Sequence, residues 1–205
     1  MTAQIFTIGH STHSVERFIA LLQGAEVDVV ADVRSSPYSR HNPQFNRPAL
    51  RDALKANGVN YVFLGEELGA RSADPKCYSD GKVVYSRLAT TAMFKRGIER
   101  ILAGAAKMRV ALMCAEAEPL DCHRTILVAK ALADRGANVN HILSDGSVES
   151  HAHAVTRLVE RYNRQAQDLF LSQDELVAEA YRRRGAEIAY QDEGLLEDAR
   201  KTANA

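Results

Sequence analysis

The stretch that most constrains the fold is residues 27–33, VDVVADV, in which valine dominates. β-Branched residues favour strands, and an apolar run of this length suits a strand that is buried on both faces. A strand of this kind needs helices on each side of its sheet. The segment therefore predicts a central strand of a parallel sheet with helices above and below it.

The rest of the chain alternates between strand-like and helix-like patterns. Ser14 is suited to cap the first helix, Pro48 to open the second, and Gly136 to end the helix before the last strand. We expect irregular loops over residues 34–47 and 65–86. Strands are predicted at residues 4–8, 27–33, 59–64, 109–113 and 138–143, and helices at 14–22, 48–58, 88–105, 122–135 and in two pieces after 150. With right-handed crossovers, this order predicts an α/β protein, a Rossmann-like or flavodoxin-like three-layer sandwich with a mostly parallel sheet.

The 205 residues are enough for one α/β core domain, which we predict over residues 1–171. Residues 172–205 are predicted to form a helical, charged C-terminal extension. Leu176, Val177, Ala180 and Tyr181 would share one side of its helix. This extension either packs on the core, contacts a second copy in a homo-oligomer, or is solvated.

Charge and cysteine content narrow the class of protein. Lys and Arg together number 26, as do Asp and Glu, so a globally basic nucleic-acid binder is disfavoured and only a local basic patch remains open. The chain shows neither a membrane-spanning apolar run nor a signal peptide, which predicts no membrane partner. Three cysteines do not make a disulfide framework, so we expect a cytoplasmic protein with reduced thiols.

Reactive residues follow several of the predicted strands. Ligands of such folds bind beyond the carboxyl ends of the strands, so these residues are expected to meet at one edge of the sheet. The candidates are His10 and Ser11 after the first strand, Asp32, Arg34, Ser39 and Arg40 after the second, and Cys114, Glu116, Cys122, His123 and Arg124 after the fourth.

The sequence Cys122-His123-Arg124 opens a predicted helix, where free N–H groups and the helix dipole stabilise a thiolate. Cys122 is thus the first candidate nucleophile and Cys114 the second. Glu116 and His123 are candidates for proton transfer. The alternatives are that both thiols are core residues, that His123 is solvated, and that Glu116 forms an ion pair with an arginine.

Asp32 and Arg34 lie two residues apart at a strand end, so their side chains share a face. Arg34, Arg40 and Arg124, with hydroxyl groups such as those of Ser39 and Ser11, are candidates for binding an anion. Asp32 and His10 would orient or deprotonate a substrate. A purely structural Asp32–Arg34 pair and a structural His10 are the alternatives.

We expect no metal. A zinc site from Cys114, Cys122, His123 and His10 is conceivable, but the cysteine spacing is not one of the short pairs typical of structural zinc. The glycine-rich turns that bind dinucleotides or triphosphates are absent, and the sequence does not identify any other cofactor.

Several short motifs together resemble one family. They are TIGHS at 7–11, DVRSxPxSR at 32–40, LG at 64–65 and at 68–69, MCAE at 113–116, Pro119 with CHR at 122–124, and HI at 141–142. The combination resembles the domain of unknown function 488 family of bacterial and archaeal proteins over about residues 4–171. This resemblance implies the same fold and the same clustered residues, and it brings no established reaction.

Three functional hypotheses follow. The leading one is an enzyme, a cysteine-dependent hydrolase or transferase, that acts on a phosphate-bearing or other anionic molecule, including a nucleotide or nucleic-acid end. The second is a nucleotide or nucleic-acid binding module without turnover, based on the basic loop 34–47. The third is a thiol redox sensor that uses Cys114 and Cys122.

Overall fold

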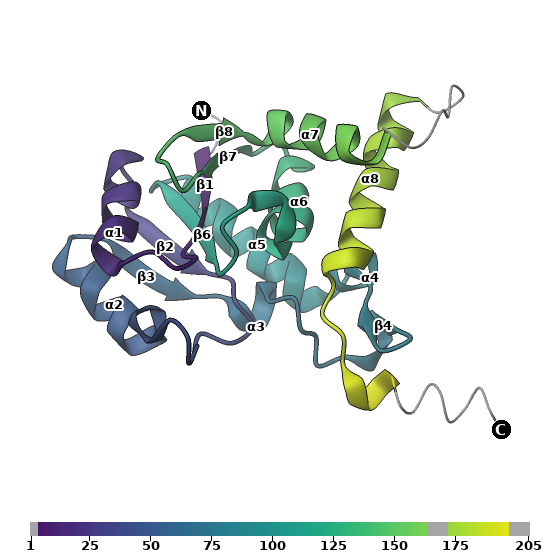
Figure 1. Cartoon of the computed structure of the whole chain (residues 1–205), viewed down its shortest axis with the longest axis horizontal. Coiled ribbons are helices and arrows are strands. Elements are labelled where there is room, and N and C mark those ends of the chain that lie inside the picture. The colour runs from purple at the N-terminus through teal and green to yellow at the C-terminus, as the bar shows by residue number, and fades with distance from the viewer. Residues whose placement is uncertain (1–3, 164–171, 197–205) are drawn as a thin grey trace.

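The computed structural model describes residues 4–163 and 172–196, and within them the predicted α/β fold is confirmed (Figure 1). A six-stranded sheet has the order β3-β2-β6-β1-β7-β8. Its strands are β1 (Gln4–Gly9), β2 (Val29–Asp32), β3 (Asn60–Phe63), β6 (Val110–Cys114), β7 (Asn138–Ile142) and β8 (Val148–Ser150). All neighbouring pairs are parallel except β7 with β8.

Helices cover both faces of the sheet. They are α1 (Val15–Gly24), α2 (Arg47–Ala56), α3 (Gly65–Leu68), α4 (Tyr85–Leu88), α5 (Ala92–Ala105), α6 (Lys130–Ala133), α7 (His151–Asn163) and α8 (Gln173–Ile188), with the π-helical segment η4 (Arg124–Ala129) and the 3₁₀ turns η1 (Pro43–Phe45), η2 (Pro75–Cys77) and η3 (Pro119–Asp121). Phe6, Ala111 and Met113 face α1 and α2, whereas Ile5 and Leu112 face α5, η4 and α6. Alternate residues along the strands thus pack into two separate hydrophobic cores, one on each face of the sheet.

The strand order differs from the Rossmann and flavodoxin orders, because β6 lies between β1 and β2. The helices after β1 and β2 lie on one face, and the helical segment after β6 lies on the other. Neighbouring strands whose connections leave on opposite faces open a crevice at their carboxyl ends. In this sheet the crevice falls at the end of β6, which positions the candidate site.

Local details depart from the sequence-based expectations in three places. The predicted helix 88–105 begins only at Ala92, as α5, because the Thr91 side chain caps it by accepting from the N–H of Phe94 at 3.2 Å. The expected loop 65–86 contains α3 and a small hairpin of β4 (Tyr78–Ser79) and β5 (Lys82–Val83). The short strand β8, formed by a tight turn at Gly146 (φ +100°), was not predicted.

The described part of the C-terminal extension packs on the core. Ala180 and Tyr181 of α8 are buried against Leu120 and Ile126, and α7 lies beside them (Figure 1). The boundary proposed at residue 172 stays a prediction. Within residues 4–163 and 172–196, the helices are all too short or too polar to cross a bilayer.

Four buried side chains from different elements form one hydrogen-bonded chain. Thr7 Oγ1 lies 2.8 Å from His141 Nδ1, His141 Nε2 lies 3.0 Å from His151 Nδ1, and His151 Nε2 lies 3.0 Å from the Tyr181 hydroxyl. Each of the three hydrogen bonds needs one proton, and a neutral imidazole offers one donor and one acceptor. The chain is therefore fully hydrogen-bonded when both histidines are neutral. Burial lowers the pKa of His151 to about 4 and that of His141 to about 2.

These lowered pKa values predict a pH-dependent stability. The neutral imidazoles stabilise the folded state fully above pH 6.5, and this contribution is lost as the pH falls from 6.5 towards 4, because only the unfolded chain binds the protons. We expect a loss of roughly 2 kcal/mol for each buried imidazole by about pH 5, measured by urea unfolding. His151→Gln should flatten this dependence, whereas His41→Gln, at an exposed histidine, should preserve it. An unchanged slope in the His151 variant would contradict the explanation.

Candidate functional site

A cavity of about 340 Å³ lies at the carboxyl ends of β2 and β6, and we call it the β2–β6 cavity. Residues from both strand ends, the loop after α3, and the chain after α8 line it. They are Arg34, Ser35, Ser36, Tyr38, Ala70, Arg71, Tyr85, Cys114, Ala115, Glu116, Asp121, His123, Ile188 and Tyr190. The expectation that reactive residues from separate segments gather at this edge is met by Arg34, Cys114, Glu116 and His123.

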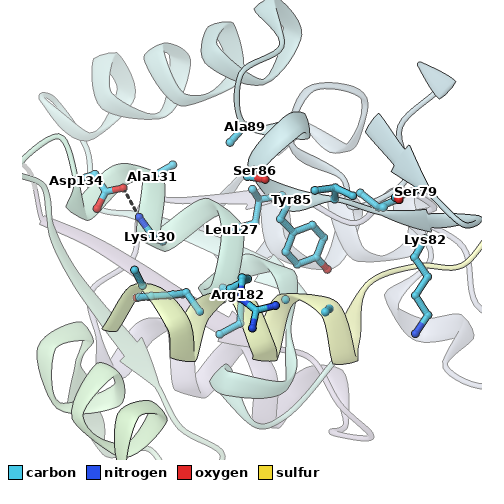
Figure 2. A pocket seen from close by; sticks show the side chains of 17 residues that line it. Ser79, Lys82, Tyr85, Ser86, Ala89, Leu127, Lys130, Ala131, Asp134 and Arg182 are labelled. Carbon is cyan, nitrogen blue, oxygen red and sulfur yellow. Dashed lines mark hydrogen bonds and ion pairs between the residues drawn. The ribbon is translucent and has the colours of Figure 1, made fainter. Parts of the chain in front are cut away.

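A second, larger cavity of about 560 Å³ lies between η4, α6, α8 and the β4–β5 hairpin (Figure 2). Its wall is mostly apolar, with Leu127, Ala131 and the ring of Tyr85. Its charged pair, Lys130 and Asp134, is joined at 2.6 Å. None of the predicted site residues lines this cavity, so the β2–β6 cavity is the candidate site.

Cys122 sits where the chain turns from η3 into the helical segment. Its backbone is extended (φ −134°, ψ 141°), and its carbonyl accepts from the N–H groups of Thr125 at 3.0 Å and Ile126 at 3.1 Å. Its Sγ accepts from the N–H of Arg124 at 3.4 Å. A sulfur in this position receives the free N–H groups and the positive end of the helix dipole, as the sequence pattern suggested.

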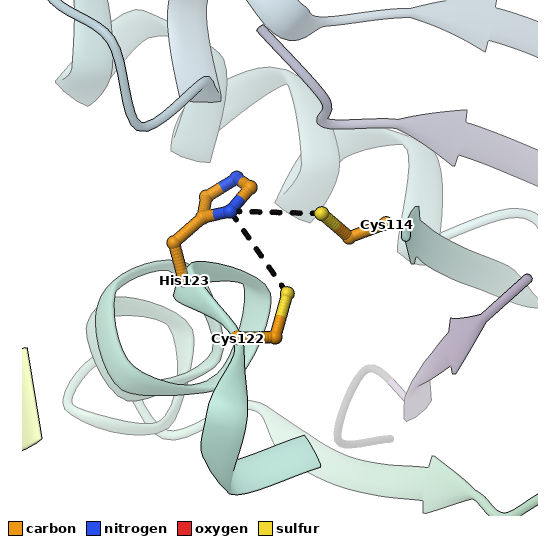
Figure 3. A group of neighbouring side chains, drawn as sticks. All are labelled: Cys114, Cys122 and His123. Carbon is orange, nitrogen blue, oxygen red and sulfur yellow. Dashed lines mark hydrogen bonds between the residues drawn. The ribbon is translucent and has the colours of Figure 1, made fainter. Parts of the chain in front are cut away.

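One ring nitrogen of His123 faces both thiols (Figure 3). Its Nε2–H donates to the carbonyl of Val33, at 3.0 Å, so Nδ1 faces the sulfurs. Nδ1 lies 3.6 Å from Cys114 Sγ and 3.9 Å from Cys122 Sγ. The end of β6 and the start of η4 thereby form one thiol–imidazole cluster, in which both thiols are almost fully buried.

The charges in the cluster are unequal. Burial alone would raise the pKa of Cys122, but a hydrogen bond from Cys114, the charge of Arg124 and His123 together hold it well below its usual range. The bond to Cys122, together with burial, raises the pKa of Cys114. Burial and the neighbouring sulfur raise the pKa of Glu116, whose Oε2 lies 2.7 Å from Cys122 Sγ, so one proton is shared between these two atoms. Despite its burial, His123 also has a raised pKa, because it bonds Cys122.

Arg124 occupies a different place from the one the sequence suggested. Its side chain is fully buried, and its guanidinium donates to the carbonyls of Glu116 at 2.6 Å and Ala117 at 3.1 Å. It does not line the β2–β6 cavity. The side chain packs against the loop after β6, and its hydrogen bonds hold this loop in place. Its positive charge also acts on the Cys122 sulfur.

Asp32 and Arg34 form a buried, two-pronged ion pair. Arg34 Nε lies 2.9 Å from Asp32 Oδ1, and Nη2 lies 2.6 Å from Oδ2, to which the Tyr61 hydroxyl also donates at 2.8 Å. This is the structural pairing that the sequence left open. Arg34 also lines the cavity, although it is only 6% exposed. Its Nη2 also donates to the carbonyl of Phe45 at 2.9 Å and its Nη1 lies 3.3 Å from His10 Nε2, so among the described residues one Nη1–H is left for a ligand. Asp32 therefore positions Arg34.

His10 and Ser11 do not line the cavity, although His10 contacts Arg34 of this ion pair. The His10 ring stacks on Phe45 at 4.4 Å, and its Nδ1–H donates to the carbonyl of Ser11 at 2.9 Å. Burial lowers the pKa of His10 to about 4, so the ring is neutral and its Nε2 accepts from Arg34 Nη1 at 3.3 Å. Ser11 takes a positive φ of 47° and bonds the carbonyl of Ala115. After the end of β1, His10 thus helps to hold Arg34, and Ser11 helps to hold the loop after β6.

The loop after β2 lines the cavity with Ser35, Ser36 and Tyr38 instead of the predicted Ser39 and Arg40. Ser39 Oγ accepts from the N–H groups of His41 and Asn42, at 3.2 Å each, and Arg40 is exposed away from the cavity lining. The cavity instead receives Arg71, whose guanidinium lies 4.4 Å from the centre of the Tyr190 ring. Arg71 follows the third predicted strand, whose end lies at the same edge of the sheet. Tyr190 follows α8, where no local motif marked it.

The fold and this cluster define an α/β protein with a thiol–imidazole site at the carboxyl end of its sheet. The family model described as a domain of unknown function, DUF488, matches residues 14–131, which is more than half of the chain. The protein therefore belongs to this family, as its motifs indicated. The matched range carries both thiols, while β1, β7 and α8 lie outside it. No curated protein and no solved structure shows significant similarity to the chain.

The position of Arg124 yields a stability prediction. Arg124→Met should lower the free energy of unfolding by about 2–4 kcal/mol, because two carbonyls of the loop lose a charged donor inside the protein. Arg135→Met is the control, since Arg135 lies in the turn after α6 and its exposed side chain also donates to a carbonyl, that of Ala131. Chemical denaturation of both variants measures the difference. Equal and small effects would show that Arg124 does not hold the loop.

Proposed function

We infer that the protein is an enzyme that acts on a small anionic molecule bound in the β2–β6 cavity, with the Cys122 thiolate as its nucleophile. One observation carries this proposal. A single cavity places two guanidinium groups, Arg34 and Arg71, opposite a cluster of thiols, imidazole and carboxyl. A volume of about 340 Å³ is typical of small-molecule sites.

The anion-binding half of the site rests on Arg71 and Arg34. Within the described part of the chain Arg71 forms no salt bridge, whereas Arg34 is paired with Asp32. The hydroxyl group of Ser35 accepts from the N–H of Arg71 at 3.0 Å and so ties the two cavity walls together. Guanidinium groups with neighbouring hydroxyls favour phosphate or carboxylate groups as ligands. A phosphate-bearing metabolite or nucleotide is the class of substrate that this wall suits.

The reacting half consists of Cys122, Glu116 and His123, with Cys114 as the second-choice nucleophile. The Cys122 thiolate attacks the electrophilic carbon or phosphorus of the substrate, and a sulfur bond forms as the bond to the leaving group breaks. Glu116 or His123 gives its proton to the leaving group. Water or another acceptor then cleaves the sulfur bond, which makes the protein a hydrolase or a transferase. Because Cys114 and Glu116 line the cavity and Cys122 does not, the substrate reaches Cys122 after one of these side chains turns aside.

Anion binding is the first test. Inorganic phosphate should raise the melting temperature of the chelator-treated protein in a saturable way, and Arg71→Ala should weaken the apparent affinity at least about tenfold. Arg40→Ala serves as control, because Arg40 is exposed and does not line the cavity. Loss of the shift in the Arg40 variant, with retention in the Arg71 variant, would move the binding site to the loop after β2. Binding that needs Arg71 but is unaffected by Cys122→Ser, in a protein without turnover, would favour a binding module.

Thiol labelling is the second test. In the chelator-treated protein, iodoacetamide should modify Cys122 at least about tenfold faster than the buried Cys77, because a thiolate reacts and a thiol does not. Bound phosphate should slow the labelling of Cys122. Peptide mass spectrometry identifies the modified residue, and Cys77→Ser is the matched control. Equal labelling of Cys77 and Cys122 would rule out the thiolate assignment.

A further inference from the structure

The three innermost atoms of the cluster have the spacing of metal ligands. Cys114 Sγ, Cys122 Sγ and His123 Nδ1 all lie within 4.8 Å of one another. A tetrahedral zinc ion with ordinary Zn–S and Zn–N bonds holds its ligand atoms about 3.5–3.8 Å apart. The two sulfur-to-nitrogen distances, 3.6 and 3.9 Å, are close to this value without any movement of the backbone.

The orientation of His123 is a second, independent observation. Ligating imidazoles normally donate their other ring N–H to a carbonyl or carboxylate, which fixes both the tautomer and the direction of the ligand nitrogen. His123 does this with Val33, because Nε2–H donates to the Val33 carbonyl at 3.0 Å. The lone pair of Nδ1 is thereby aimed between the sulfurs (Figure 3).

We propose that Cys114, Cys122 and His123 bind one Zn²⁺ ion, with a fourth coordination position open to the β2–β6 cavity. Two thiolates balance the charge of the ion, so the loaded site is neutral and suited to its burial. Cys114, His123 and Glu116 also line the cavity, so the fourth position is reached from the side where the anion binds. Three protein ligands with one open position are typical of catalytic zinc rather than structural zinc.

This inference rests on the proposed function for the ligand that takes the fourth position, and it assigns a second role to Cys122. In the zinc-loaded protein Cys122 is a metal ligand, and the anion held by Arg71 and Arg34 coordinates the ion. In the metal-free protein the same sulfur is the nucleophile. The carboxyl of Glu116, 2.7 Å from Cys122 Sγ, lies beside the fourth position in either state.

The sequence argued against zinc because Cys114 and Cys122 are not spaced like the short cysteine pairs of zinc fingers. The short spacing is needed where both cysteines lie in a single tight turn of the chain. In this protein the loop of residues 115–121 leaves β6 and returns to the start of η4, where Arg124 binds its carbonyls. A longer spacing therefore still brings the sulfurs together.

Metal content and a cobalt spectrum test the site directly. The full-length protein, stripped with chelator and dialysed against Zn²⁺, should retain about one ion per chain by elemental analysis. Co²⁺ in its place should give the thiolate-to-cobalt charge-transfer band and the visible bands of a tetrahedral complex. Absence of retained zinc and of the charge-transfer band in the wild-type protein would overturn the proposal, whatever the variants show.

Variants assign the ligands. Cys114→Ser and Cys122→Ser should each weaken Co²⁺ binding at least about 100-fold and reduce the charge-transfer band, since loss of a direct ligand costs more than loss of an outer partner. Cys77→Ser, at a buried cysteine outside the cluster, should leave both unchanged. Circular dichroism checks that each variant is folded. A band that persists in both cluster variants, or is lost in Cys77→Ser, would contradict the assignment.

The two proposals can fail separately. Phosphate binding that is measured in chelator-treated protein tests the proposed function without metal. If phosphate binds and zinc does not, the metal site is wrong and the anion site stands. If zinc is retained, Co²⁺ gives the expected spectrum and phosphate has no effect on either form, the metal site stands and the proposed substrate class is wrong.

Discussion

The buried guanidinium of Arg124 is the interaction on which the site depends. Loop carbonyls after a strand normally face water, and here two of them face a cation inside the protein. This fixes the loop between β6 and η4, and the loop in turn sets the distance between Cys114 and Cys122. The same charge stabilises the Cys122 thiolate. One residue thus joins the packing of the sheet to the chemistry at its edge.

The sheet supplies the second constraint through a close approach of backbones. Gly9 ends β1 beside Cys114, and a Cβ atom at this position would lie 1.8 Å from the carbonyl oxygen of Glu116. Only a residue without a side chain lets the loop after β6 cross the end of β1. Gly9 thus leaves room for the loop after β6, and Arg124 binds the same loop through its carbonyls.

Much of the fold could be predicted from the sequence because it is encoded locally. Valine-rich strands and the caps at Ser14 and Gly136 are features of a few consecutive residues, and the structure confirms them. The insertion of β6 between β1 and β2 could not be predicted, because strand order depends on which helix covers which face. The gathering of Arg34, Cys114, Glu116 and His123 followed from the rule for strand ends. The inward turn of Arg124 did not, because a side chain direction depends on the loop that it meets.

The residues that line the cavity come from two parts of the chain, one inside and one outside the range that the family model matches. Arg34 and Cys114 belong to the part of the chain that the family model covers, whereas Ile188, at the end of α8, and Tyr190, just after it, lie outside that part. Tyr190 carries the ring on which Arg71 rests. Arg71 and the two thiols therefore lie in the range that the family model covers, whereas the ring that supports Arg71 lies outside it. Relatives that keep the thiols but end differently would present another contour to incoming molecules, so selectivity can diverge while the reacting groups stay the same.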